Sequence, residues 1–198
     1  FTYGDVLGMT SRTGNALREL GVREGERVML LLHDSPELVF SFLGAIRAGL
    51  VPIPANTLLK PHDYEYLLND SQARALIVGE ALLARVEPVR DSLPHLRHTI
   101  VVGRPGAGQI SYRDLVDASS PELAPVERWQ GDVCFWLYSS GTTGFPKAAV
   151  HLQRDMIVCA DLYARDILRL GEHDRTFSAA KLFFAYGLGN GLYFPFRA

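Results

Sequence analysis

Short apolar runs alternate with amphipathic stretches along most of the chain, and this alternation is the first indication of its fold. Apolar residues recur at helical spacing over residues 1–20, with Thr2 as a candidate N-cap and Gly21 as a stop signal. The apolar run over residues 27–32 is bounded by polar residues, as a buried strand would be. A second helix is predicted to begin at Pro36, since proline fits the first position of a helix.

The same alternation continues towards residue 130. The pattern predicts strands over residues 51–54, 75–78 and 99–102, and helices over residues 61–70, 80–92 and 112–118. Strands that alternate with helices are joined by right-handed crossovers, which place the strands mostly parallel in one sheet. The chain is therefore predicted to be an α/β protein with a mostly parallel sheet flanked by helices.

A candidate phosphate-binding loop follows the apolar run of residues 132–138. Six small or hydroxyl residues come next: Ser139, Ser140, Gly141, Thr142, Thr143 and Gly144. Glycines let successive backbone N–H groups converge on an anion, and hydroxyls add donors for phosphoryl oxygens and ligands for Mg²⁺. Lys147, one of only three lysines, adds a charge for the β- and γ-phosphates of a nucleotide. A flexible surface loop of the same composition is the alternative interpretation.

This loop differs from the P-loop pattern, in which Gly immediately precedes Lys and Ser or Thr follows it. Pro146 precedes Lys147 here, and Ala148 follows it. Residues 148–151, Ala-Ala-Val-His, form a short and mostly apolar run, as expected of a returning strand. The loop is therefore predicted to be the tip of a β-hairpin.

The segment from Tyr138 to Lys147 resembles the signature loop of the adenylate-forming superfamily, which includes acyl- and aryl-CoA synthetases, luciferases and the adenylation domains of peptide synthetases. The similarity covers ten residues without a gap. Most members carry Gly after the Lys, whereas this chain has Ala148, as in a variant found in benzoate-CoA ligases. Residues 49–70 also resemble the superfamily, although less specifically.

A second segment, residues 181–190, is similar to the acyl-substrate motif of the superfamily in its benzoate-CoA ligase form. In that form, the residues that match Ala185, Tyr186 and Gly187 line the pocket for a flat aromatic acid. Tyr186 would supply an aromatic wall, and Gly187 would leave room for a ring against the backbone. Without the resemblance, the apolar residues 183–186 would be interpreted as core packing.

The resemblance implies that the complete protein joins an aromatic carboxylate to ATP, releases pyrophosphate and transfers the aryl group to coenzyme A, with Mg²⁺ bound. It also implies a catalytic Lys in a C-terminal domain that lies outside these residues. We expect residues 1–198 to be a partial N-terminal AMP-binding domain that is inactive alone. Residues 1–130 would form its first α/β portion, and residues 131–198 the phosphate loop and the start of the acyl-substrate portion. A non-catalytic nucleotide- or phosphate-binding module remains the alternative, and the sequence does not decide which aryl acid is used.

Composition changes this picture little. The chain is 47% hydrophobic and 21% charged, and its net charge of −2 gives no electrostatic reason to expect nucleic acid or an anionic membrane as a partner. The sequence has no apolar stretch of membrane-spanning length and no signal-peptide pattern, so a cytoplasmic location is expected. Surface left uncovered by a missing C-terminal part predicts self-association.

The remaining reactive or ionisable side chains are interpreted as structural. Cys134 and Cys159 lie in apolar runs and are predicted to be buried thiols, and no metal site is predicted. His151, which follows the loop, is expected to have a structural role, and Lys181 to form a salt bridge or face solvent. Asp161 and Arg165 are expected to pair on a helix over residues 152–168.

Overall fold

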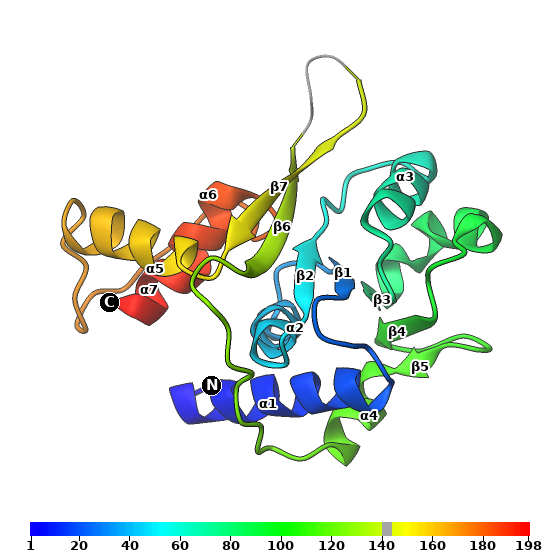
Figure 1. Ribbon diagram of the computed structural model, residues 1–198, viewed down its shortest axis with the longest axis horizontal. Coiled ribbons are helices and arrows are strands. Elements are labelled where there is room, and N and C mark those ends of the chain that lie inside the picture. Colours follow the sequence, from blue (N-terminus) through cyan, green and yellow to red (C-terminus); the bar gives the residue numbers. More distant parts are fainter. Residues whose placement is uncertain (140–143) are drawn as a thin grey trace.

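A five-stranded parallel sheet lies at the centre of the protein, for which the computed structural model describes residues 1–139 and 144–198 (Figure 1). The strands are arranged in the order β2-β1-β3-β4-β5. Their bounds are Arg27–Leu31 for β1, Val51–Pro54 for β2, Ala75–Gly79 for β3, His98–Val102 for β4 and Ile110–Ser111 for β5. This confirms the predicted parallel α/β sheet, while β5, which is only two residues long, had no periodicity by which to be predicted.

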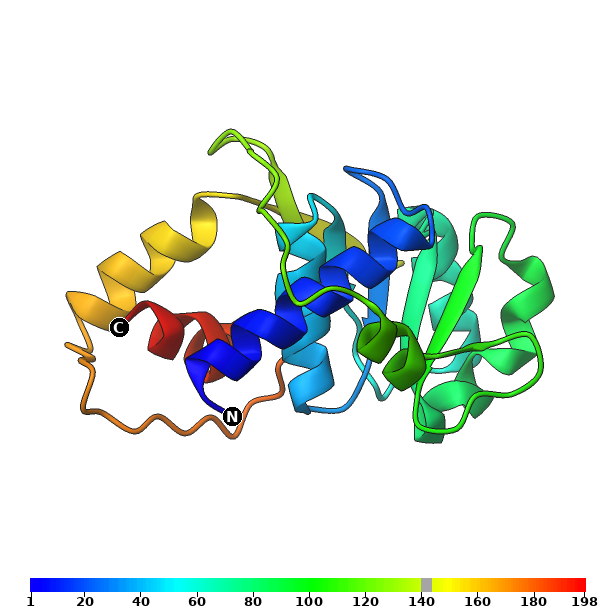
Figure 2. The same cartoon turned by 90° about the horizontal axis from the view of Figure 1, so that it is seen from below.

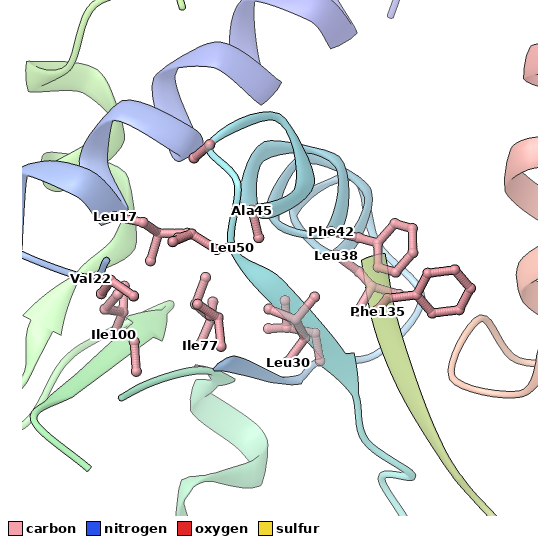
Figure 3. Close-up of a cluster of buried hydrophobic side chains, with 14 of the residues drawn as sticks. Leu17, Val22, Leu30, Leu38, Phe42, Ala45, Leu50, Ile77, Ile100 and Phe135 are labelled. Carbon is pink, nitrogen blue, oxygen red and sulfur yellow. The ribbon is translucent and has the colours of Figure 1, made fainter. Parts of the chain in front are cut away.

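Helices cover both faces of the sheet. The first layer contains α1 (Tyr3–Glu19), α2 (Pro36–Arg47) and α4 (Tyr112–Ala118), and the second contains α3 (Pro61–Ser71) with the 3₁₀ helices η1 (Glu80–Arg85) and η2 (Glu87–Ser92). Successive side chains of a strand point to opposite faces. Leu30 and Ile77 accordingly pack with the first layer (Figure 3), and Met29 and Leu76 with the second.

Local signals account for the ends of the helices. The Thr2 hydroxyl accepts a hydrogen bond from the Asp5 N–H at 3.2 Å, and the Asp5 carboxylate accepts one from the Thr2 N–H at 2.7 Å. These two bonds form a capping box that begins α1. Gly21 and Gly49 follow α1 and α2 with φ of 80° and 77°, the left-handed conformation that glycine adopts without strain.

The predicted helix over residues 80–92 is wrong in type, because η1 and η2 replace one continuous α-helix. Pro88 explains the break. Its ring has no N–H to donate to the carbonyl four residues earlier and would clash with that carbonyl in a continuous helix. Two short 3₁₀ segments that meet at Val86 avoid this conflict.

The predicted β-hairpin is confirmed and stands outside the parallel sheet. Strand β6 (Val133–Ser139) pairs antiparallel with β7 (Lys147–Leu152). The hairpin lies beside β2, and its Phe135 ring meets Phe42 of α2 edge-on, with 5.3 Å between the ring centroids (Figure 3). The hairpin is therefore attached to the first helical layer.

The C-terminal part of the chain, from residue 155 onwards, packs beside the hairpin. It contains α5 (Asp155–Cys159), the π-helical η3 (Ala160–Arg165), an irregular stretch, α6 (Ala185–Leu188), the π-helical η4 (Gly189–Tyr193) and α7 (Phe194–Arg197). Figure 2 shows the irregular stretch running back from the end of η3 towards α6. Among the described residues, no helix combines the length and the apolar character that crossing a membrane requires.

The prediction of two buried cysteines is half wrong. Cys134 is fully buried in the core between β6 and the first helical layer, whereas Cys159 is exposed. The apolar run that contains Cys159 belongs to a helical surface of α5 and η3 that the described residues leave uncovered. Ile157, Val158, Leu162, Ile167 and Leu168 are exposed on or beside it.

A close approach of α1 and α2 predicts a sharp difference between two glycines. A Cβ on Gly44 would lie 2.6 Å from the Thr10 carbonyl oxygen and 3.0 Å from the Gly14 nitrogen, whereas a Cβ on Gly8 would meet nothing within 4 Å. We expect Gly44→Ala to lower the free energy of unfolding by about 1–3 kcal/mol through overpacking. Gly8→Ala should instead raise it by up to about 1 kcal/mol through helix propensity. Urea unfolding measures both, and equal effects would contradict this packing.

The two thiols should also differ in reactivity. Burial raises the pKa of Cys134 to about 12, so its thiolate is scarce near neutral pH. We expect iodoacetamide to alkylate Cys159 in the folded protein and Cys134 only after denaturation, as followed by peptide mass spectrometry. Equal rates at the two thiols in the folded protein would contradict the burial of Cys134.

Candidate functional site

The hairpin formed by β6 and β7 holds the two ends of the candidate phosphate loop together. Ser139 ends β6 and Lys147 begins β7, and these residues face one another in the register of the hairpin. Both are exposed. Gly144 has a φ of 142°, which supports the expectation that a glycine is needed there. The predicted phosphate-binding residues Ser140, Gly141, Thr142 and Thr143 lie outside the described residues.

Two side chains of α3 contact this hairpin near its tip. The Tyr66 hydroxyl donates to the Pro146 carbonyl at 3.1 Å, and its ring stacks on Phe145 with 4.7 Å between centroids. The Tyr138 hydroxyl donates to an oxygen of Asp70 at 2.6 Å. Burial, with a further contribution from the Asp70 carboxylate, raises the pKa of Tyr138, so its hydroxyl stays protonated at neutral pH.

A cavity of about 370 Å³ opens between the hairpin, the end of β2 and the segment that leads into α6. This volume lies within the range of small-molecule sites. Most of the lining is apolar, and polar groups come from Asn56, Tyr138, Ser139 and His151. The remaining lining residues are Pro54, Leu59, Leu67, Leu137, Pro146, Ala149, Phe183, Phe184 and Ala185. The cavity thus borders both the hairpin of β6 and β7, called the phosphate hairpin below because it carries the candidate phosphate loop, and the predicted substrate segment, residues 181–190.

The structure gives the three predicted substrate residues different surroundings. Ala185 lines the cavity, while Tyr186 is 70% exposed and Gly187 is buried, and neither belongs to the lining. Gly187 has a packing role instead, because a Cβ there would collide with the Lys181 carbonyl and lie 2.6 Å from the Ala180 carbonyl oxygen. Direct contact of Tyr186 and Gly187 with an aromatic acid stays a prediction.

Asp34, which follows β1 closely, holds the beginning of the substrate segment. Its carboxylate accepts a hydrogen bond from the Leu182 N–H at 3.1 Å and lies 3.7 Å from the Lys181 ammonium. This confirms the salt bridge expected of Lys181. The contact joins residues 148 positions apart, so the sheet and the substrate segment are placed relative to one another.

His151 lies in the cavity wall in a fixed orientation. Its ring stacks almost parallel on Phe135, with centroids 4.4 Å apart, and its Nδ1 lies 3.7 Å from an Asp155 carboxylate oxygen. These two contacts are compatible with the structural role expected of His151, which stays a prediction because its ring also lines the cavity. Within residues 1–139 and 144–198, no three His, Cys, Asp or Glu side chains form a group that could hold a metal ion.

Comparison with known proteins places this chain in a family. The sequence pattern of the family described as "AMP-binding enzyme" matches residues 1–198. The chain belongs to the AMP-binding enzyme family. It is 47% identical to the benzoate–CoA ligase of Thauera aromatica over 196 residues, which make up 98% of this chain and 37% of that enzyme. It is 40% identical to the 4-hydroxybenzoate–CoA/benzoate–CoA ligase of Rhodopseudomonas palustris, again covering 98% of this chain and 36% of the relative.

Solved structures of AMP-binding enzymes agree with this placement. The anthranilate CoA ligase AuaEII, in complex with anthranoyl-AMP, superposes with a TM-score of 0.95 and 44% identity over 97% of this chain and 37% of that one. A benzoate CoA ligase from Burkholderia xenovorans LB400 gives a TM-score of 0.89 and 43% identity over 98% of this chain and 38% of that one. The chain spans little more than a third of the length of these relatives, and its fold is that of the matching portion.

The side chains that hold this candidate site together were not predicted from the sequence. Tyr66, Asp70 and Asp34 carry no motif, and each acts through a partner far away in the chain. The sequence held one indication for Tyr66 and Asp70, because their spacing of four residues places them on the same side of a helix. The contacts with Tyr138, Phe145 and Pro146 give that spacing its meaning.

The close backbone contact at Gly187 predicts a local effect of substitution. We expect Gly187→Ala to displace residues 180–182, lower the free energy of unfolding by about 1–3 kcal/mol and speed tryptic cleavage after Lys181. Gly171→Ala is the matched control, since a Cβ there would lie 4.0 Å from its nearest neighbour, Asp174 Oδ2. Unchanged stability and cleavage in Gly187→Ala would show that the backbone does not approach so closely.

Proposed function

We propose that the full-length protein containing this chain is an ATP-dependent aryl-CoA ligase of the benzoate-CoA ligase type. It would adenylate an aromatic carboxylate with release of pyrophosphate, and the thiol of coenzyme A would then take the aroyl group and displace AMP. The observation that carries this proposal is the cavity bordered by Ser139 and Pro146 of the phosphate hairpin on one side and by Phe184 and Ala185 of the substrate segment on another. A carboxylate and a nucleotide phosphate must meet in such a place to form an acyl adenylate.

The shape and polarity of the cavity support an aromatic acid. Leu137, Phe183 and Ala185 supply apolar surface for a flat ring, and a volume of about 370 Å³ suits a single small ring with its carboxylate. Relatives of this chain are named for benzoate, hydroxybenzoate and anthranilate, and these acids differ only in their ring substituents. We therefore propose benzoate or a substituted benzoate as the substrate class.

The chain's own groups suit the charge changes of the reaction. The carboxylate oxygen attacks the α-phosphorus, the bond to the β-phosphate oxygen breaks, and negative charge accumulates on the departing pyrophosphate. Donors held in advance of the reaction stabilise such charge with little reorganisation. Ser139, Gly144 and Lys147 flank the loop that would bind the phosphates, and Lys147 contributes the positive charge. Residues 140–143 would add hydroxyl and backbone donors, with Mg²⁺ bound to the phosphates as a co-substrate.

The proposal predicts acid-dependent chemistry by the full-length protein. We expect benzoate to stimulate the exchange of pyrophosphate into ATP and the formation of benzoyl-CoA. Removal of the charge by Lys147→Met should raise KM for ATP about tenfold while KM for benzoate changes less than twofold. Arg113→Met is the matched control, because it removes an equally positive, 88% exposed side chain from α4 and should leave both constants unchanged.

Two outcomes would count against this function. Tight ATP binding without exchange in the presence of benzoate, hydroxybenzoates or anthranilate would favour the non-catalytic nucleotide-binding module. Exchange by residues 1–198 alone would contradict the proposal that this portion needs the rest of the protein for catalysis.

A further inference from the structure

We propose that α3 positions the phosphate hairpin for ATP through Tyr66 and Asp70, which makes both of them positioning residues for the nucleotide. The inference rests on the proposed function for its biological meaning, since it assigns the hairpin to ATP. The contacts themselves join α3 to residues 138, 145 and 146, all of which the structure describes.

The two anchoring side chains are aligned by helix geometry. Residues four apart in an α-helix lie one above the other on the same side. Tyr66 and Asp70 have this spacing within α3 and both point to the hairpin, where they reach Pro146 and Tyr138. One helix therefore holds both arms of the hairpin at once.

The anchors act at the two points where the chain enters and leaves the phosphate loop. Tyr138 directly precedes Ser139, the last residue of β6, and Pro146 directly precedes Lys147, the first residue of β7. The hydrogen bond from Tyr66 is made to the carbonyl of the peptide unit that carries the Lys147 N–H. Fixing this peptide plane fixes the direction in which the Lys147 backbone departs.

The helix can serve as an anchor because its other side is immobilised in the core. Tyr64 and Leu67 are 0% exposed and Leu68 is 2% exposed, and all three pack in the second core layer, against the sheet. The Tyr64 hydroxyl also donates to the Asn56 carbonyl at 2.8 Å, which ties α3 to a loop that lines the cavity. The position of α3, and with it that of the hairpin, therefore follows from the sheet.

Positioning explains these contacts better than general stabilisation does. Phe145 is 69% exposed although it stacks on Tyr66, and Asp70 is exposed as well, so these two partners bury little surface, while Tyr66 and Tyr138 are partly buried against the second core layer. Their main effect is to restrict the hairpin. A site held in its binding geometry before the ligand arrives loses less conformational entropy on binding. Loosening the anchors should therefore weaken ATP binding more than folding.

The test compares the loss of the Tyr66 hydroxyl with the loss of another bonded tyrosine hydroxyl. In the full-length protein, Tyr66→Phe removes the bond to Pro146 and keeps the ring stack, and Tyr66→Leu removes both. Tyr112→Phe is the matched control, because its hydroxyl lies 3.0 Å from the Thr13 hydroxyl in the core between α1 and α4, away from the hairpin. ATP and benzoate affinities are measured by calorimetry, and the mobility of residues 144–152 by hydrogen-exchange mass spectrometry.

We expect Tyr66→Phe to raise Kd for ATP about fivefold and to speed exchange in residues 144–152, and Tyr66→Leu to do so more strongly, with Kd for benzoate changed less than twofold. Tyr112→Phe should lower the thermal midpoint and leave Kd for ATP unchanged. Asp70→Ala, which frees the Tyr138 hydroxyl, should reproduce the effect of Tyr66→Phe.

The proposal is overturned if Kd for ATP stays within twofold of the wild-type value in both Tyr66 variants, or if the affinities for ATP and benzoate fall together with stability as in a general structural defect. Unchanged hydrogen exchange in Tyr66→Leu also overturns it, whatever the activity. Failure of the proposed function gives a different result. The wild-type protein would then bind ATP without acid-dependent exchange of pyrophosphate, while the Kd for ATP of the Tyr66 variants would still test the positioning role.

Discussion

Burial of the parallel sheet between two helical layers is the constraint from which the geometry of the site follows. Leu30 and Ile77 face the layer of α1 and α2, and Met29 and Leu76 face that of α3. Because both faces are apolar, neither layer can leave the sheet without exposing the core. The helices α2 and α3 are thus fixed on opposite sides of one rigid element, and the hairpin that carries the candidate phosphate loop contacts both of them.

The hairpin is held by apolar packing on one side and by hydrogen bonds on the other. Phe135 packs against Phe42 of α2 through apolar contact, which is insensitive to small rotations. On the side of α3, hydrogen bonds from Tyr66 to Pro146 and from Tyr138 to Asp70 impose direction as well as distance. Apolar packing thus places the base of the hairpin, and the hydrogen bonds orient the part that leads into the loop.

The opposite wall of the cavity depends on the same sheet. Asp34, close after β1, holds the residues around Lys181, and Gly187 lets the backbone fold back against the Lys181 carbonyl. Both sides of the cavity are therefore positioned by β1 and the layers packed around it. In the proposed reaction, such shared support would hold the acid and the nucleotide in a constant relation.

Local chemistry was enough to predict much of this protein from its sequence. The capping box of Thr2 and Asp5, the glycines that end α1 and α2, the parallel sheet and the hairpin all follow from neighbouring residues and periodicity. Pro88 was visible in the sequence, but the helical pattern around it led to the prediction of one continuous helix.

The rest depended on contacts between distant parts of the chain. Apolar neighbours suggested burial for Cys159, yet its helix presents that surface outward. Tyr66 and Gly187 became informative only once Pro146 and the Lys181 carbonyl lay beside them. Sequence by itself determined most of the helices and strands and the candidate phosphate-loop motif, because these rest on interactions within a few residues. Tertiary structure alone decided which side chains hold the loop and which line the cavity, because those contacts join residues up to 148 positions apart.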